Sequence, residues 1–341
     1  MDKVRRLVKT HDQKIMAGVL LYLIVLAFMP LFAKSYTVFL FTKILLWALV
    51  CMGYILLTGF GGMGSFCVVT FYGLMAYAVA VCIKRFAMPY GIGVLIALGV
   101  CTVVAFLYSI VAIKTKGRYF LMMSVAFINL VYLTVYQWTT LTGGGNGMNA
   151  LPSPTIFGLS ISKQTTVFYF VYILVFLAYL LIKLITNSPF GIAIMGSRDN
   201  AVKMESLGFN VKLLRLALMM IAAFFAFIGG ICHCVLYTNV APDNVGLSTS
   251  IIIVFMCLVG CVKKVEGAFV GTILYVLLQN RISEFTDRYN MIIGALLILA
   301  VLFLPKGILG YTMDDIKANI RKFKEKRQVK AELKKEKNMT K

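Results

Sequence analysis

Charged side chains are scarce in this chain of 341 residues. Only 14% of its residues are Asp, Glu, Lys or Arg, whereas 60% are hydrophobic. A soluble domain carries about 25% charged residues, so these charges are too few to cover the apolar surface in water. This excludes a soluble enzyme, a soluble nucleic-acid-binding domain and a secreted disulfide scaffold. Because lipid-exposed backbone must satisfy its own hydrogen bonds, the composition predicts an all-α, polytopic helical membrane bundle.

Acidic residues and histidine are scarcer still, at 13 and two. Most carboxylates lie outside the apolar runs, so we expect no proton relay of the usual intramembrane kind. The motifs G-x-x-x-x-G-K-[ST] and H-E-x-x-H do not occur. Cys232-His233-Cys234 has the look of a metal site, but we interpret it as three small residues near a helix end. We therefore expect no catalytic residues, no metal site and no cofactor bound by this chain.

Basic residues give the chain a formal charge of +21, and they gather at both ends. Such residues next to apolar spans mark cytoplasmic segments. We therefore predict a cytoplasmic N-terminus (1–14), a membrane domain (15–305) and a basic cytoplasmic tail (306–341). Orientation and lipid contact explain this charge better than nucleic-acid binding does.

The apolar runs predict the membrane spans, each of which needs about 20 residues. Residues 250–280 contain Lys263, Lys264 and Glu266 near their middle and form either one interrupted helix or two short spans. With both termini cytoplasmic the number of crossings is even, so we prefer two short spans and ten crossings, with eight as the fallback. The other predicted spans are 15–33, 37–57, 65–83, 91–113, 119–138, 164–185, 213–236 and 290–304.

Four glycines lie between Gly59 and Gly64. The segment matches G-x-G-x-x-G, but no β-α-β unit surrounds it, so it does not predict a dinucleotide site. It is either a broken helix, whose exposed N–H groups suit a carboxylate, or a plain tight hairpin. Elsewhere, Gly267 and Gly271 form a G-x-x-x-G, which favours close helix packing. Lys43 lies near the start of its span and either snorkels to the interface or contacts substrate.

A polar loop, 186–212, separates two spans and has the signals of a short helix. Pro189 and Gly191 end the preceding span, Ser197 or Asp199 can cap the helix, and Gly208 can end it in the left-handed conformation. A capped, charged helix between two spans is suited to docking a soluble partner.

This loop and several other motifs resemble the LivM-type permeases of branched-chain amino acid ABC importers. In the loop these are Ser188-Pro-Phe-Gly191, Arg198-x-Asn200 and Glu205-x-Leu207-Gly208. The glycine segment with Phe71 and Tyr77, the run Leu141-Thr-Gly-Gly-Gly-Asn-Gly-Met148 and the ending Pro305-Lys-Gly-Ile-Leu-Gly310 also resemble the family, so the likeness covers about residues 50–310. Met63, Cys67-Val68, Ile252 and Lys263-Lys264 depart from the family pattern.

The resemblance implies a multi-pass permease subunit of the bacterial cytoplasmic membrane, not an enzyme. Its partners would be a second, related permease in a heterodimer, two cytoplasmic ATPase subunits that hold ATP and Mg²⁺, and an extracytoplasmic solute-binding protein. The substrate would be a branched-chain or other hydrophobic amino acid. A permease for urea or a short amide, a sugar or a nucleoside is the alternative, followed by an ion-coupled secondary transporter.

The resemblance also assigns two sets of candidate site residues. The expected substrate pathway comprises Gly59, Gly61, Gly62, Ser65, Phe66, Gly73, Tyr77 and Asn146. The expected ATPase-coupling surface comprises Gly191, Arg198, Asn200, Met204, Glu205, Leu207 and Gly208.

The predicted topology can be tested with reporter fusions at Gly145 and at the C-terminal tail. The loop that contains Gly145 has almost no basic residues, whereas the tail is strongly basic, so the two fusions should report opposite sides of the membrane. Alkaline phosphatase and fluorescent-protein activities measure this. A result placing both on the same side would contradict the ten-span topology.

Overall fold

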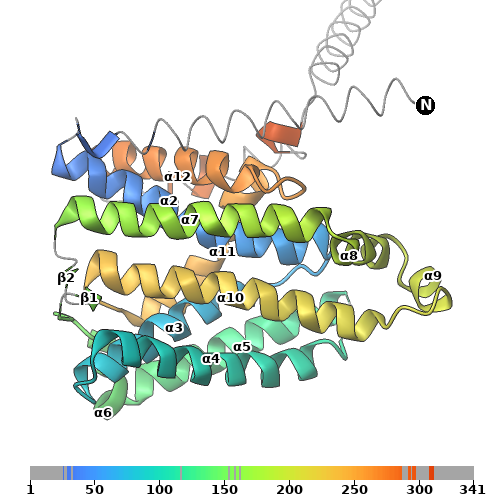
Figure 1. The fold of residues 1–341 in the computed structure, drawn as a ribbon, viewed down its shortest axis with the longest axis horizontal. Helices are drawn as coiled ribbons and strands as arrows, with labels where there is room; N and C mark the ends of the chain where they lie inside the picture. The colour runs from blue at the N-terminus through green and yellow to red at the C-terminus, as the bar shows by residue number, and fades with distance from the viewer. Residues whose placement is uncertain are drawn as a thin grey trace, which may run out of the picture.

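The described part of the chain is built almost entirely from helices (Figure 1). A computed structural model describes residues 26, 29–31, 34–115, 117–152, 154–156, 159–160, 163–285, 291–292, 294–296 and 307–310. The predicted N-terminus 1–14 and all but residues 307–310 of the predicted tail 306–341 lie outside the described residues, and so do most of the predicted spans 15–33 and 290–304.

Six of the helices are long. They are α2 (Ser35–Ile55), α3 (Cys67–Lys84), α4 (Tyr90–Ala112), α5 (Arg118–Gln137), α7 (Gln164–Asn187) and α10 (Val211–Tyr237). The shorter ones are α6 (Thr139–Thr142), α8 (Pro189–Asp199), α9 (Ala201–Ser206), α11 (Leu247–Gly260) and α12 (Gly267–Ser283). Single turns are η1 (Met29–Leu31), η2 (Leu56–Phe60), η3 (Gly144–Asn146), η4 (Pro242–Asn244) and η5 (Ile308–Gly310). Two short strands, β1 (Thr155–Ile156) and β2 (Leu159–Ser160), pair antiparallel with Thr155 opposite Ser160.

Among the described residues, six helices are long and apolar enough to cross a membrane, namely α2 with its extension η2, α3, α4, α5, α7 and α10. Each coincides with a predicted span, which confirms the helical membrane bundle. The long helices lie side by side along the long axis of the molecule (Figure 1). Helices α8 and α9 lie at one end, called here the α8–α9 end, and α6, β1 and β2 lie at the other, called the α6 end.

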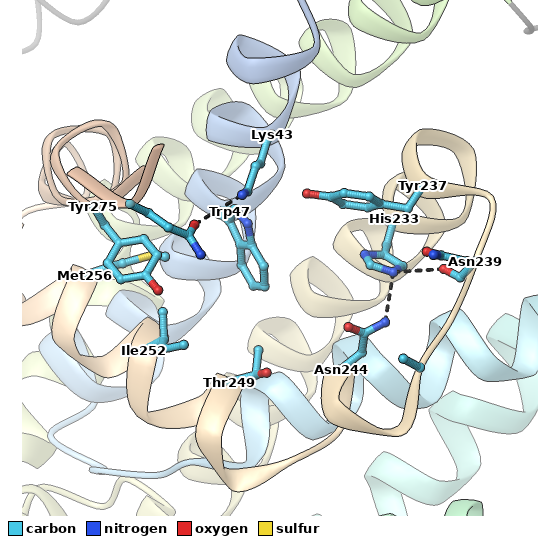
Figure 2. A pocket seen from close by; sticks show the side chains of 12 residues that line it. Lys43, Trp47, His233, Tyr237, Asn239, Asn244, Thr249, Ile252, Met256 and Tyr275 are labelled. Carbon is cyan, nitrogen blue, oxygen red and sulfur yellow. Dashed lines mark hydrogen bonds between the residues drawn. The ribbon is translucent and has the colours of Figure 1, made fainter. Parts of the chain in front are cut away.

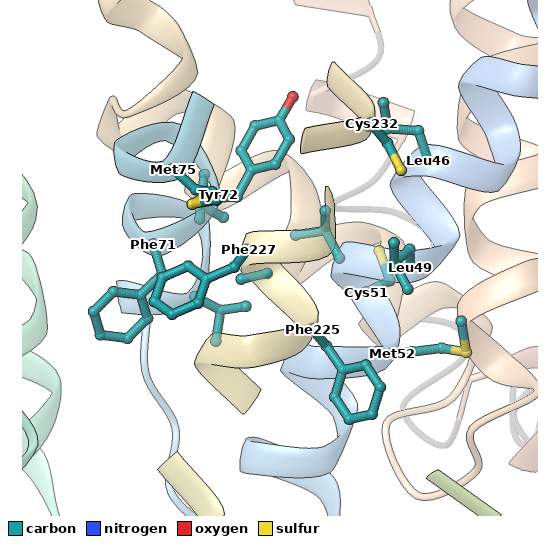
Figure 3. Close-up of a cluster of buried hydrophobic side chains, with 14 of the residues drawn as sticks. Leu46, Leu49, Cys51, Met52, Phe71, Tyr72, Met75, Phe225, Phe227 and Cys232 are labelled. Carbon is teal, nitrogen blue, oxygen red and sulfur yellow. The ribbon is translucent and has the colours of Figure 1, made fainter. Parts of the chain in front are cut away.

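The core forms where α2, α3 and α10 meet. Helix α2 packs against α7, α10 and α12, while α3 packs against α4 and α10. Figure 3 shows side chains from these three helices interlocking, with Phe71 and Tyr72 on α3, Leu49 on α2, and Phe225 and Phe227 on α10. All five are almost fully buried. These buried apolar faces fix the central helices, on which the candidate sites are built.

The outer helices keep an apolar face exposed. Leu95 on α4, Leu130 on α5 and Leu184 on α7 are 71%, 63% and 69% exposed. Apolar faces of this extent are rare on a protein surrounded by water. They are the expected surface of helices that contact lipid.

Residues 250–280 form two helices, as the ten-span topology requires at this point. Helix α11 ends at Gly260, a turn follows, and α12 begins at Gly267. The turn is tied to α7, because Glu266, which is 3% exposed, accepts a hydrogen bond from Tyr179 (3.2 Å) and pairs with Lys183 (2.5 Å). The total number of crossings stays a prediction.

The G-x-x-x-G packs α12 closely against α11. A Cβ atom on Gly271 would lie 1.9 Å from the carbonyl oxygen of Met256, which is backbone and cannot move aside cheaply. The motif therefore serves packing within the chain.

Replacing Gly271 with Val should destabilise the protein by about 1–3 kcal/mol, because the two helices would have to separate. A lower Tm of the purified protein in detergent is the measurement. Gly99→Val is the matched control, since Gly99 also lies within a helix but has no atom within 4 Å of its Cβ position. Equal Tm values for the two variants would contradict the packing role.

Candidate functional site

The glycine segment interrupts the junction of α2 and α3 at the α8–α9 end. Helix α2 continues into η2, a π-helical turn in which Gly61 N–H bonds the carbonyl of Leu56 (3.2 Å). Gly62 then has a φ of +66°, a conformation that side-chain-bearing residues rarely adopt. Helix α3 does not begin until Cys67. The segment is therefore an irregular, non-helical connection between two separate spans that begins with a π-helical turn, and such π turns occur often at functional sites.

Three elements pack directly onto this break. A Cβ on Gly59 would lie 1.8 Å from the carbonyl oxygen of Val262 in the α11–α12 turn. On Gly61 it would lie 2.2 Å from Leu218 of α10, and on Gly62 it would lie 2.3 Å from the Cγ of Arg198 in α8. Only glycine allows this close approach, so the break joins α8, α10 and the α11–α12 turn.

Arg198 is exposed on α8, yet its guanidinium group also reaches the break. Its Nη1 donates to the carbonyl oxygen of Gly59 (2.7 Å), while its Nη2 pairs with Asp199 (3.0 Å). The expected place of Arg198 on the ATPase-coupling surface stays a prediction, and the structure adds that Arg198 links α8 to the break. A small cavity of about 130 Å³ lies beside this link, lined by Gly61, Gly62, Arg198 and Arg215 among others.

The polar loop forms two capped helices where we expected one. Ser188 caps α8 by accepting from Gly191 N–H (3.3 Å). Asn200 caps α9 by accepting from Lys203 N–H (3.0 Å). The expected caps Ser197 and Asp199 are wrong because α8 extends through both of them. Gly208 follows α9 with a φ of +85°, as predicted.

The coupling residues divide between the inner and outer faces of this loop. Gly191 is buried where α8 turns away from α7. Met204 is half-buried and packs back toward α8 at Gly196. The exposed face of α9 instead carries Glu205, Leu207 and Val202, and the last two are both 72% exposed.

A second cavity, called here the Lys43 pocket, opens at the α6 end and has a volume of about 310 Å³. Figure 2 shows side chains from α2, α10, α11 and α12 reaching into it. Its described lining is Lys43, Trp47, His233, Tyr237, Asn239, Ala241, Asn244, Thr249, Ile252, Met256, Tyr275 and Gln279.

Lys43 lies on one wall of this pocket. Its Nζ donates to Oε1 of Gln279 on α12 (3.2 Å). Among the described residues, no carboxylate lies within ion-pairing distance of this ammonium group. In the pocket, the Lys43 ammonium group thus donates one hydrogen bond to a neutral amide, and its other N–H groups can donate to a ligand.

His233 organises the opposite wall. Its Nδ1 hydrogen-bonds the hydroxyl of the buried Tyr72 (2.6 Å). Its Nε2 lies 2.9 Å from Asn244 Nδ2 and 3.1 Å from the carbonyl oxygen of Asn239. That nitrogen can accept from Asn244 or donate to Asn239, but not both at once. In either tautomer His233 holds the loop after α10, so it is a positioning residue for this wall.

The remaining pathway candidates lie apart from both cavities. Ser65 accepts from Cys67 N–H (3.2 Å), and Phe66 N–H donates to Ser124 (3.2 Å), so both shape the start of α3. Gly73 faces the backbone of Asn244 and Tyr77 is buried on the same helix. Asn146 is exposed in η3. The structure thus does not bring the eight pathway candidates into one cavity.

Residue spacing alone did not identify the Lys43 pocket. Lys43 and Trp47 are one helical turn apart, which is a usable signal, but His233, Asn244 and Gln279 come from three other segments. For Cys232-His233-Cys234, the described residues contain no cluster of three potential ligands that could hold a metal ion. His233 instead hydrogen-bonds Tyr72 through Nδ1 and either Asn239 or Asn244 through Nε2.

Comparison with known proteins places the chain among transport proteins. Residues 36–302 match the family described as "Branched-chain amino acid transport system / permease component". The chain is also similar to the high-affinity branched-chain amino acid transport system permease protein LivM of Salmonella typhimurium and to that of Escherichia coli, at 22% identity over 286 residues in both cases. These matches cover 77% of this chain but only 65% of the length of each relative. No solved structure matches the chain.

The family match includes all six helices that are able to cross a membrane, as well as the break and the α8–α9 loop. It covers well over half of the chain. This integral membrane protein therefore belongs to the permease-component family of branched-chain amino acid transport systems.

Proposed function

We propose that this chain is one permease subunit of an ATP-driven importer in the bacterial cytoplasmic membrane, carrying branched-chain or similar apolar amino acids inward. The family match over residues 36–302 carries the proposal. The chain itself catalyses no bond-making step. ATP and Mg²⁺ bind to two partner ATPase subunits, a related permease completes the pathway, and an extracytoplasmic protein delivers the solute.

The α8–α9 loop supports the ATPase part of this proposal. Val202 and Leu207 are exposed at a polar end of the molecule, away from the outer helices that contact lipid. Glu205 is also exposed, so the short helix offers apolar and charged contacts together. Behind it, Arg198 ties α8 to the break through Gly59. Movement of a docked ATPase would thus reach the membrane helices through one hydrogen bond and one packed junction.

The rival functions make different demands on the structure. An ion-coupled transporter commonly uses a buried carboxylate. Glu266 is the only buried acidic side chain among the described residues, and Lys183 neutralises it. A sugar or nucleoside permease would favour a pocket rich in neutral hydrogen-bonding groups. The Lys43 pocket contains such groups, but it also contains one cation and several apolar side chains, which suit an apolar amino acid better than a sugar.

Uptake of radiolabelled leucine by vesicles containing the complete complex tests the function. Uptake should require ATP on the side of the membrane where the ATPase subunits lie. It should also require the binding protein and this chain. A partner ATPase whose Walker lysine is replaced serves as the control and should abolish uptake while leaving assembly intact. ATP-independent leucine uptake, or retention of an unrelated solute by the co-encoded binding protein, would contradict the proposal.

Replacing Gly62 with Leu should lower uptake at least about tenfold, since the positive φ and the contact with Arg198 leave no room for a side chain. The complex should still assemble, as shown by co-purification of the ATPase. Gly64→Leu is the matched control two residues away, because no atom lies within 4 Å of its Cβ position and its φ is not positive. Wild-type uptake by the Gly62 variant would contradict a role of the break in transport.

A further inference from the structure

We infer that the Lys43 pocket is a binding site for a small aliphatic carboxylic acid, with the Lys43 ammonium as the contact for the carboxylate. The inference rests on the proposed function for its choice of probe, L-leucine, but the site itself follows from the pocket's chemistry. None of the eight pathway candidates assigned by the resemblance lies among its described lining, although a substrate contact was one of the two alternatives for Lys43.

The charge of the pocket selects the sign of the ligand. Lys43 is the only charged residue in the described lining, and its one hydrogen-bond partner there is the neutral amide of Gln279. A half-buried ammonium group without a counter-charge is costly, and an incoming carboxylate removes that cost. A cationic solute would meet an uncompensated like charge. The pocket therefore favours an anionic or zwitterionic ligand.

The arrangement of polar and apolar groups selects the shape of the ligand. Lys43 lies near the start of α2, and Trp47 lies one turn deeper, about 6 Å along the helix. On α11, Thr249 near the mouth is followed by Ile252 and then Met256, which is 1% exposed. Polar groups thus lie near the mouth and apolar groups lie deeper. A carboxylate at Lys43 would place an aliphatic tail against Trp47, Ile252 and Met256.

The other walls are built to keep this shape. His233 Nε2 holds the loop that carries Asn239 and Asn244, either by accepting from Asn244 (2.9 Å) or by donating to the carbonyl oxygen of Asn239 (3.1 Å). With its Nδ2 on His233, Asn244 turns its amide oxygen toward the cavity (Figure 2). Tyr237 reaches in from the wall opposite Lys43. At about 310 Å³ the cavity is at the small end of ligand pockets, which suits one amino acid rather than a peptide.

Binding of tritiated L-leucine to the whole permease–ATPase complex in nanodiscs, without the binding protein, tests this site directly. Lys43→Met keeps most of the side-chain volume but removes the charge, and should weaken binding about tenfold or more. Lys43→Arg keeps the charge and should stay within about threefold of the wild type. Gln279→Glu places a carboxylate beside Lys43 and should weaken binding as much as Lys43→Met, even though Lys43 is retained.

Competing ligands identify the group that Lys43 recognises. 4-Methylpentanoate, which has the carboxylate and the branched tail but no amino group, should compete with leucine. Leucinamide, which lacks the carboxylate, should compete at least about tenfold more weakly than leucine. Size-exclusion profiles and basal ATPase activity of each variant show that the complex is intact.

The outcomes separate this inference from the proposed function. Unchanged leucine binding by both Lys43→Met and Gln279→Glu, equal competition by leucinamide, or no saturable binding to the wild type would each overturn the site. ATP-driven leucine uptake would in those cases leave the proposed function standing. Charge-dependent binding in a complex that shows no ATP-driven uptake would support the site and overturn the function.

Discussion

Arg198 can donate a hydrogen bond to the carbonyl oxygen of Gly59 (2.7 Å) because the residues around this carbonyl are glycines, which leave the backbone accessible. The π-helical end of α2 presents this carbonyl, and the glycines around it admit α8, α10 and the α11–α12 turn to direct contact. A side chain at Gly59 or Gly61 would collide with backbone or a core leucine. Close approach at this break thus determines how the α8–α9 loop is joined to the central helices, and the helix junctions at that end follow from it.

The two ends of the molecule use their polar groups differently. At the α8–α9 end, several polar groups have partners within the protein: Ser188 and Asn200 cap helices, and Glu266 pairs with Lys183. Arg215 Nε, beside the small cavity there, is buried without a hydrogen-bond partner. That end is rigidly connected and exposes Val202 and Leu207 as its free surface. At the α6 end, the Lys43 pocket keeps a cation without a carboxylate partner among the described residues. An end joined to the central helices by packing suits transmission of movement, and a pocket that holds a cation without a counter-charge suits an anionic ligand.

The sequence predicted features that depend on neighbouring residues, but it did not predict features that depend on contacts between distant segments. Hydrophobic runs predicted six spans within a few residues, because apolar length alone decides whether a helix can cross a lipid bilayer. Glycine predicted the break, since backbone conformation is a local property. Caps were misplaced by one to three residues because α8 continues through Ser197 and Asp199, so that the next cap is Asn200. The Lys43 pocket could not be assembled because its walls come from four helices whose register only packing sets.

Two lysines within helices show why residue type alone does not assign a role. Lys183 pairs with a buried carboxylate at 2.5 Å and lies beside the ring of Tyr179, so its charge is used to fix the α11–α12 turn. Among the described residues, the one partner of Lys43 is an amide oxygen at 3.2 Å, next to a cavity of about 310 Å³. A charge in a membrane protein must be neutralised, hydrated or matched by a ligand, because burying it alone is costly. The charge of Lys183 is neutralised by Glu266 within the fold, whereas the charge of Lys43 can be neutralised by an anionic ligand in the pocket.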